Sequence, residues 1–230
     1  YNVEFLTGTD EHGLKIQRAA EEKGIDPKKF CDEISKTFRN LSNILNLTNT
    51  DFIRTTEDRH KIAALDFWKR LENNEQIYLS KYKGWYSVRD EAFYQEKELV
   101  KVNGDLVTPD GGKVEWVEEE SFFFKLSKWE AKLLEFYENN PNFVKPKTRY
   151  NEVKKFVESG LRDLSISRTS FSWGIKIPGN DSHIMYVWID ALTNYLTSIG
   201  YPNFDNNLDY WNNCTHIIGK DILKFHAVYW

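Results

Sequence analysis

Three segments of the sequence share one order: a short apolar run, then a tight polar turn, then a helical pattern. The first begins with Val3–Leu6, continues through the turn Thr7–Gly13 and reaches a predicted helix over residues 14–23. The apolar runs of the other two are Ile184–Trp188 and Thr215–Ile218. Apolar runs that alternate with helices are typical of parallel strands buried on both faces. The order therefore predicts an α/β fold with ligands at the carboxyl ends of its strands.

The chain between the first and second segments follows another pattern. Helices are predicted over 27–45 and 57–73, and alternating strands and turns follow over 77–127. Asn103-Gly104-Asp105 between two apolar runs is a strong hairpin signal. Further helices are predicted over 128–139 and 149–160. We therefore expect one domain formed by residues 1–75 and 161–230, with an α+β insertion at 76–160.

Composition limits the class of protein. The net charge of −4 is unlike that of a non-specific nucleic-acid binder, and 40% apolar residues suffice for a sizeable core. We find no apolar run long enough to cross a bilayer and no secretion signal. Cys31 and Cys214 are expected to be reduced, buried thiols in a cytoplasmic protein. Both ends of the chain are apolar, so we expect it to be a piece of something longer.

The turn of the third segment, Gly219-Lys220-Asp221, lies between a predicted strand and the start of a helix. Free N–H groups and the helix dipole favour anions there. Asp221 also suits a simple N-cap. Ile222 and His226 are four residues apart and share a helix face, and a buried structural histidine is the alternative interpretation.

The second and first segments offer further candidates. Trp188, Ala191 and Tyr195 are spaced to lie on one side of a strand end and the following helix, where two rings can hold a flexible apolar group. Core packing is the alternative. Asp190 is interpreted as the N-cap of that helix. Asp10 and Glu11 follow the first strand, where their carboxylates can cap the following helix or bind an ammonium group or a ribose hydroxyl.

Four stretches occur in order: Thr7–Gly13 (Thr-Gly-Thr-Asp-Glu-His-Gly), Asp163–Arg168 (Asp-Leu-Ser-Ile-Ser-Arg), Tyr186–Ala191 (Tyr-Val-Trp-Ile-Asp-Ala) and Gly219–His226 (Gly-Lys-Asp-Ile-Leu-Lys-Phe-His). Together they resemble bacterial and organellar methionyl-tRNA synthetases. The segment Gly84–Tyr94 resembles the insertion of the branch that lacks a zinc knuckle. The resemblance covers essentially the whole chain.

This resemblance implies a class I synthetase with a Rossmann-like parallel sheet and a connective insertion. Such an enzyme activates L-methionine with ATP and Mg²⁺ and transfers it to tRNA(Met). Asp10 matches the family's aspartate for the methionine α-ammonium, and Gly219 and Asp221 match positions at the methionine–ATP junction. Arg168 matches an arginine that helps to bind both substrates. The side-chain pocket is matched by Trp188, Ala191, Tyr195, Ile222 and His226.

Parts of the family pattern differ or are missing. Neither class I ATP signature, His-Ile-Gly-His or Lys-Met-Ser-Lys-Ser, is present, so we expect the chain to be inactive alone. Lys125-Leu-Ser-Lys128 resembles the second signature but precedes Gly219, and we interpret it as structural. Leu192 stands where some relatives have proline. The histidines lack zinc-ligand spacing, so no structural zinc is expected. We also expect the protein to be a monomer.

Two alternatives remain open at this stage. A class I synthetase for another amino acid would need a different aromatic pattern or a metal-binding set. A non-catalytic folded fragment would keep the scaffold without binding methionine. A nicotinamide-dependent enzyme is excluded because the chain has no Gly-x-Gly-x-x-Gly turn.

Overall fold

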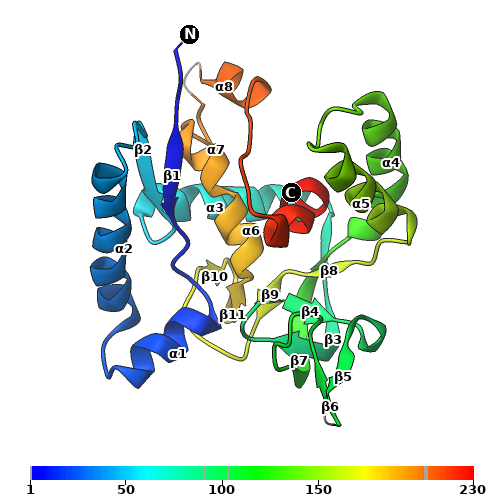
Figure 1. The fold of residues 1–230 in the computed structure, drawn as a ribbon. Helices are drawn as coiled ribbons and strands as arrows, with labels where there is room; N and C mark the ends of the chain where they lie inside the picture. Colours follow the sequence, from blue (N-terminus) through cyan, green and yellow to red (C-terminus); the bar gives the residue numbers. More distant parts are fainter. Residues whose placement is uncertain (1, 91, 103, 205–206) are drawn as a thin grey trace.

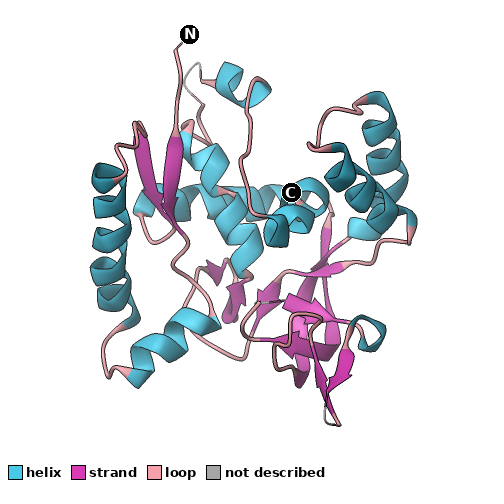
Figure 2. Cartoon of the chain, viewed as in Figure 1, coloured by secondary structure: helices cyan, strands magenta, loops and turns pink. Residues whose placement is uncertain are grey.

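The computed structural model describes residues 2–90, 92–102, 104–204 and 207–230. It has an α/β fold whose strands form four separate sheets within the described residues. Figure 2 shows one pair of strands lying apart from the others, with helices on both sides of it. Of the helices that the structure describes, none is both long and apolar enough to cross a lipid bilayer.

The separate pair consists of β1 (Leu6–Thr9) and β2 (Asp51–Arg54) and is the one parallel pair among the described strands. Gly8 lies opposite Ile53, and a Cβ atom at Gly8 would stand 2.0 Å from the Ile53 carbonyl oxygen. Only glycine allows this close approach. The observed strand β1 begins at Leu6, three residues after the start of the predicted run Val3–Leu6. The sequence does not predict β2.

Two helices connect β1 to β2 and confirm the predictions for this stretch: α1 (Leu14–Glu22) and α2 (Pro27–Ile44). The Asp26 carboxylate caps α2 by accepting a hydrogen bond from the Lys29 backbone N–H at 3.1 Å, and Pro27 takes the first helical position. Figure 1 shows α2 standing beside the strand pair.

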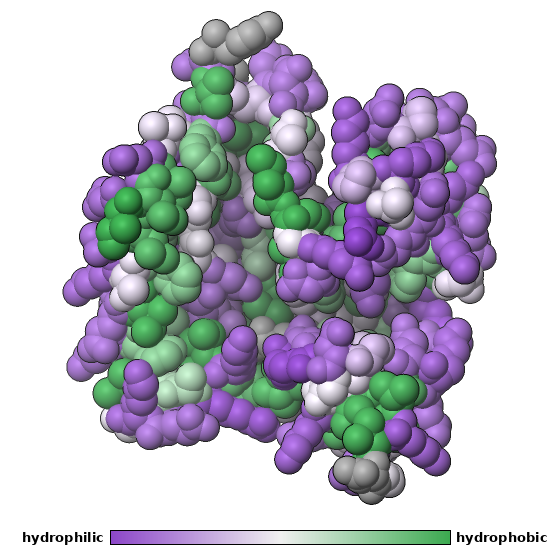
Figure 3. All heavy atoms as spheres, viewed as in Figure 1, coloured by the Kyte–Doolittle hydropathy of each residue, from purple (hydrophilic) through white to green (hydrophobic). Residues whose placement is uncertain are grey.

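The outer face of α2 carries apolar side chains that remain exposed. Phe38 is 49% exposed, Leu41 40% and Ile44 66%. Figure 3 shows apolar atoms gathered over this helix. The spacing of three residues places these side chains on one face, so α2 is apolar toward both the strands and solvent.

The main core lies under α3 (Asp58–Asn73), which matches the predicted helix. Ala64 and Trp68 of α3 are fully buried, and they pack with Met185 and Ile177. The Trp68 ring meets the Phe122 ring edge to face, with centroids 5.4 Å apart. This aromatic contact joins α3 to the strands of the insertion.

The insertion contains an antiparallel sheet with the order β4-β3-β7-β8. Its two long strands are β3 (Ile77–Ser87) and β7 (Glu115–Phe124), which pair antiparallel from Ile77 opposite Phe124 to Tyr86 opposite Glu115. The predicted hairpin is present as β5 (Val100–Val102) with β6 (Asp105–Val107); its residue Asn103 lies outside the described residues. The short elements are β4 (Ala92–Tyr94), η1 (Glu96–Glu98) and β8 (Leu164–Ser165).

A helix pair completes this region, as predicted: α4 (Glu130–Asn139) and α5 (Lys147–Glu158). Tyr137 and Val157 are fully buried between them. The turn η2 (Leu126–Trp129) follows β7; Lys125 is its N-cap, and Leu126 is buried in the same core. That position agrees with a structural role for this stretch. The domain bounds 76–160 remain a prediction, because β8 pairs with β7 across the proposed boundary.

The second segment differs from the prediction of a parallel strand at Ile184–Trp188. β11 (Asn180–Met185) ends earlier and pairs antiparallel with β9 (Ser167–Arg168) and β10 (Lys176–Ile177). The apolar run continues directly into α6 (Val187–Leu192), and α7 (Asn194–Ser198) follows. A continuous apolar run is compatible with a buried helix start as well as with a strand, and here it contains both.

The third segment also differs, because Thr215–Ile218 forms no strand in the structure. It is an irregular stretch after α8 (Leu208–Asn212) and leads into the single turn η3 (Lys220–Ile222). The chain then forms one wide helical turn, η4 (Phe225–Tyr229), closed by a hydrogen bond from the Trp230 N–H to the Phe225 carbonyl at 3.0 Å.

Candidate functional site

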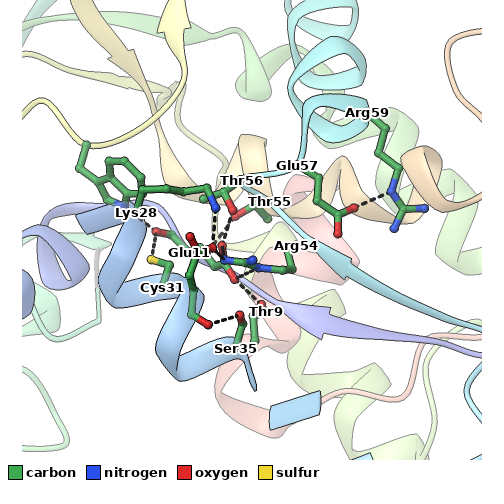
Figure 4. Close-up of polar contacts among 12 residues, drawn as sticks. Thr9, Glu11, Lys28, Cys31, Ser35, Arg54, Thr55, Thr56, Glu57 and Arg59 are labelled. Atoms are coloured by element: carbon green, nitrogen blue, oxygen red, sulfur yellow. Dashed lines mark hydrogen bonds and ion pairs between the residues drawn. The ribbon is translucent and has the colours of Figure 1, made fainter. Parts of the chain in front are cut away.

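The turn after β1 is held by the buried Glu11 side chain (Figure 4). Its carboxylate accepts hydrogen bonds from the Thr9 hydroxyl at 2.7 Å, from the Thr56 hydroxyl, and from Arg54 at 2.6 and 2.9 Å. The Glu11 N–H donates to the Thr55 hydroxyl at 2.9 Å. A carboxylate with this many donors is fixed in direction. The turn that carries Asp10 is therefore rigid on both sides of that residue.

The charges around this carboxylate alternate in sign. Arg54 also pairs with Asp32 at 2.7 Å, and Lys28 pairs with Asp32 at 2.5 Å. The hydrogen bond from Lys28 is the largest effect on Asp32 and lowers its pKa; burial opposes it, and the hydrogen bond from Arg54 lowers the pKa further. Hydrogen bonds to Glu11 and Asp32 raise the pKa of Arg54 further above its ordinary value. The network links α2, β2 and the turn.

Asp10 lies at the outer side of this turn and is exposed, directly after the carboxyl end of β1. Glu11 and His12 beside it are buried. The structure thus places the Asp10 carboxylate at the strand edge where the sequence predicts a ligand, with a rigid backbone beneath it.

Asp190 is not an N-cap, which corrects the sequence interpretation. It lies inside α6, is fully buried, and accepts from His12 Nδ1 at 2.5 Å and from His60 Nε2 at 2.7 Å. Burial acts to raise the pKa of Asp190, but the charge and hydrogen bonds of His12 and His60 outweigh it and leave the pKa lowered. The N-cap position is taken by Tyr186.

An aromatic cluster is formed by Trp188, Tyr195, Phe225 and His226. The Trp188 ring stacks on the Phe225 ring with centroids 3.8 Å apart and planes 9° apart. The Tyr195 hydroxyl lies 2.8 Å from His226 Nε2. Ile222 packs against the same group, together with the buried Leu192. Ala191, beside Leu192, is 8% exposed. The structure thus brings Trp188, Tyr195, Ile222 and His226 together, as the sequence predicts.

The protonation of His226 follows from its two contacts. His226 Nδ1 lies 3.0 Å from the Ile222 carbonyl oxygen, which only accepts, so Nδ1 carries the proton. In the neutral ring, Nε2 then accepts the hydrogen bond from the Tyr195 hydroxyl. Burial lowers the pKa of His226, and the hydrogen bond to Ile222 opposes this only in part. The cluster therefore presents a neutral imidazole at pH 7.

Arg168 is 1% exposed, whereas Asp10 is exposed. Its guanidinium carbon is 4.2 Å from the centroid of the Phe93 ring and 4.1 Å from that of the Tyr186 ring. One guanidinium nitrogen, Nη1, donates to the Ser165 hydroxyl at 2.8 Å, whereas Nε and Nη2 have no hydrogen-bond partner among the described residues. The Glu119 carboxylate pairs with Nε electrostatically at 3.7 Å, which is too long for a hydrogen bond.

Gly219 and Asp221 stand at the exposed start of the last helical turns. A Cβ atom at Gly219 would lie 2.5 Å from the Asp221 carboxylate oxygen, so the glycine leaves room for that side chain to fold back. Asp221 lies in η3 and not at its N-cap, which is Gly219. The N-cap alternative for Asp221 is therefore wrong.

The two cysteines differ from each other. Both are free thiols; Cys31 is buried as predicted, but Cys214 is exposed. Burial, reinforced by the Glu11 charge, raises the pKa of the Cys31 thiol to about 12, so this thiol is unreactive. Across the described ranges, no group of three or more His, Cys, Asp or Glu side chains has the arrangement to hold a metal ion.

The strand-end turn, the aromatic cluster and the antiparallel insertion lie in a fold that matches aminoacyl-tRNA synthetases of class I. A family model described as "tRNA synthetases class I (M)" matches residues 1–105 and 103–230, and the chain belongs to this family. The relatives it resembles are methionine–tRNA ligases. It is 56% identical to the methionine–tRNA ligase of Rickettsia felis and 54% identical to that of Brucella suis, in both cases over its full length.

Solved structures agree with this assignment. The methionyl-tRNA synthetase of Mycobacterium tuberculosis bound by methionyl-adenylate matches with a TM-score of 0.97 and 49% identity, covering 100% of this chain and 46% of that one. The apo form of the Mycobacterium tuberculosis enzyme matches with a TM-score of 0.82 and 40% identity, covering 99% of this chain and 52% of that one. The chain spans 44% of the Rickettsia felis protein and 45% of the Brucella suis protein.

Several residues that build the site are missing from the sequence prediction. His12, His60 and Phe225 each contact a predicted site element, yet nothing in their spacing marks them as partners. One signal was available for Asp190: a carboxylate inside an apolar run, Tyr186–Leu192, needs buried donors if the run is buried.

Proposed function

We propose that the protein to which this chain belongs activates L-methionine with ATP and transfers the methionyl group to tRNA(Met). The methionine carboxylate oxygen attacks the α-phosphorus of ATP, a new P–O bond forms, and the bond to the bridging oxygen breaks to release pyrophosphate. The 3′-terminal adenosine of the tRNA then displaces AMP. The observation that carries this proposal is the aromatic cluster in a chain 56% identical throughout to a methionine–tRNA ligase.

The aromatic cluster suits a thioether. A sulfur in contact with aromatic rings gains about 0.3–1.5 kcal/mol per contact. The stacked Trp188 and Phe225 rings offer such a surface, and the neutral His226 adds no charge that would have to be desolvated against an apolar side chain. We propose that Trp188, Tyr195 and His226 contact the methionine side chain. Ala191 and Ile222 complete the same surface.

The remaining sites carry charge. We propose that the exposed Asp10 carboxylate binds the methionine α-ammonium, because the Glu11 network fixes the turn beneath it. Gly219 and Asp221 are proposed to meet ATP, which enters as its Mg²⁺ complex. Arg168 is proposed to help bind both substrates, since two of its guanidinium nitrogens have no hydrogen-bond partner within the described residues. Activation of this kind is mostly positioning and charge stabilisation.

The similarity to the adenylate complex supports the same ligand for this chain. The TM-score is 0.97 against the methionyl-adenylate complex and 0.82 against the apo form of the same enzyme. The arrangement of elements here thus suits an adenylate-bound site. A monomeric state and a cytoplasmic location stay predictions.

Amino-acid-dependent ATP–pyrophosphate exchange tests the proposal. We expect the full-length protein to exchange with methionine alone among the twenty amino acids. Trp188→Ala should lose most of this exchange through a higher KM for methionine, because the stacked ring surface is removed. Trp116→Ala, which changes a ring 58% exposed in β7, is the matched control and should behave as wild type. Exchange with another amino acid would favour a class I synthetase for that amino acid. A folded protein that shows no exchange with any amino acid would favour a non-catalytic scaffold.

A further inference from the structure

The buried Asp190 carboxylate joins parts of the chain that are distant in sequence. It is fully buried in α6 between Trp188 and Ala191, and each of its oxygens accepts from one imidazole. His12 Nδ1 is 2.5 Å from Oδ2, and His60 Nε2 is 2.7 Å from Oδ1. The proposed function assigns no substrate contact to Asp190 or to either histidine.

Each partner of Asp190 comes from an element next to a proposed methionine contact. His12 is two residues after Asp10 in the turn that follows β1. His60 belongs to α3, and its Nδ1 lies 3.2 Å from the Thr197 hydroxyl of α7, the helix that carries Tyr195. α6 itself carries Trp188. One carboxylate therefore connects the proposed ammonium contact with both parts of the proposed side-chain surface.

We propose that Asp190 is a positioning residue for methionine, which fixes the distance between the Asp10 turn and the α6–α7 helices through His12 and His60. The inference rests on the proposed function. Asp190 reaches the substrate only through its neighbours, so it is not a catalytic residue. The ligand it positions is an α-amino acid held at both its ammonium and its side chain.

The chemistry of the junction favours positioning over stability. An ionised carboxylate only accepts hydrogen bonds, so both imidazoles must turn an N–H toward it, which fixes their tautomers and ring directions. A buried charged junction adds little net stability compared with apolar packing, because desolvation offsets the attraction. The junction instead fixes the directions of the His12 and His60 rings. Trp173 limits His12 further, with its ring edge to face at 5.5 Å.

The test uses the full-length protein and the exchange assay with methionine and ATP varied separately. Asp190→Asn keeps the shape but replaces one acceptor with a donor, so one imidazole loses its alignment. We expect the KM for methionine to rise about tenfold or more, as for a misaligned hydrogen bond to a charged group, while the KM for ATP changes by less than about twofold. Asp66→Asn, which changes a carboxylate bonded to the Tyr201 hydroxyl, is the matched control and should change neither KM.

A second pair of variants applies where Asp190→Asn does not fold. Asn at position 12 places a side-chain N–H close to where His12 Nδ1 lies, whereas phenylalanine removes it. We expect His12→Asn to keep the wild-type KM for methionine and His12→Phe to raise it. A KM for methionine unchanged in His12→Phe, and in Asp190→Asn where that variant folds, would overturn the inference and leave the proposed function intact. Equal increases in both KM values would assign the junction to the general fold. A wild-type protein without methionine exchange would overturn both.

Discussion

At the scale of single residues, His226 shows how burial and one carbonyl group set a chemical state. The Ile222 carbonyl fixes the proton on Nδ1, the Tyr195 hydroxyl donates to Nε2, and burial disfavours a second proton. His216 lies 6.0 Å away, ring to ring, and burial followed by the His226 charge lowers its pKa as well. The two rings can stay side by side because both are neutral.

The lowered pKa values of His216 and His226 predict that the protein loses stability in acid. Both folded-state pKa values lie below the ordinary value of 6.5, so the unfolded chain binds protons first as the pH falls. The free energy of unfolding should therefore decrease once the pH drops below about 6.5, by up to about 1.4 kcal/mol per pH unit for each group. Urea unfolding of the chain at pH 7.5, 6.5 and 5.5 measures this.

His226→Gln provides the comparison for the acid effect. Glutamine keeps an acceptor for the Tyr195 hydroxyl but does not titrate. Its free energy of unfolding should fall less steeply between pH 6.5 and 5.5 than that of the wild type. Equal slopes for the two proteins would show that His226 keeps its ordinary pKa when folded.

At the scale of elements, the close contact of β1 with β2 depends on Gly8. Gly8→Ala would place a methyl group 2.0 Å from the Ile53 carbonyl oxygen, so the strands must move apart. We expect the free energy of unfolding to fall by about 1–3 kcal/mol, the usual cost of overpacking. Because Asp10 follows β1, the KM for methionine of the full-length protein should also rise.

Thr7→Ala in the same strand removes atoms instead of adding them and is the control for Gly8→Ala. It should leave the strand spacing and the KM for methionine near wild type. Thermal unfolding and the exchange assay measure both variants. If Gly8→Ala matched Thr7→Ala in both measurements, the strand contact would not position the site.

The helices were predictable because their signals are local. The apolar period and the Asp26-Pro27 cap define α2 without reference to the rest of the chain. Strand identity is not local, because Thr215–Ile218 has the composition of a strand but forms none here. β2 is only four residues long, and its partner lies more than forty residues earlier in the chain.

The site residues also differ in whether a local sequence signal reveals them. Trp188, Tyr195, Ile222 and His226 could be grouped from helical spacing and family resemblance, and the structure joins them. Asp190 could not be understood from its neighbours in sequence, because its two donors come from a turn and a helix far away. An aspartate before a helical pattern resembles an N-cap until burial and partners are known.

At the scale of the whole molecule, the chain contains the residues proposed to bind methionine but neither of the class I ATP signatures. The aromatic cluster and the Asp10 turn are both in place, and the chain spans 44% of the Rickettsia felis relative. Neither His-Ile-Gly-His nor Lys-Met-Ser-Lys-Ser occurs in its sequence. Amino-acid contacts and phosphate contacts can thus be separated by experiment.

We expect the 230-residue chain alone to fold but to show methionine-dependent pyrophosphate exchange no higher than background. The physical reason is that the donors of both ATP signatures, which would stabilise charge on the triphosphate in the transition state, are missing from this sequence. The full-length protein assayed at equal concentration is the positive control, and circular dichroism checks that the chain is folded. Exchange by the chain above background would mean that residues within it, Lys220 and Arg168 foremost, stabilise that charge without either signature.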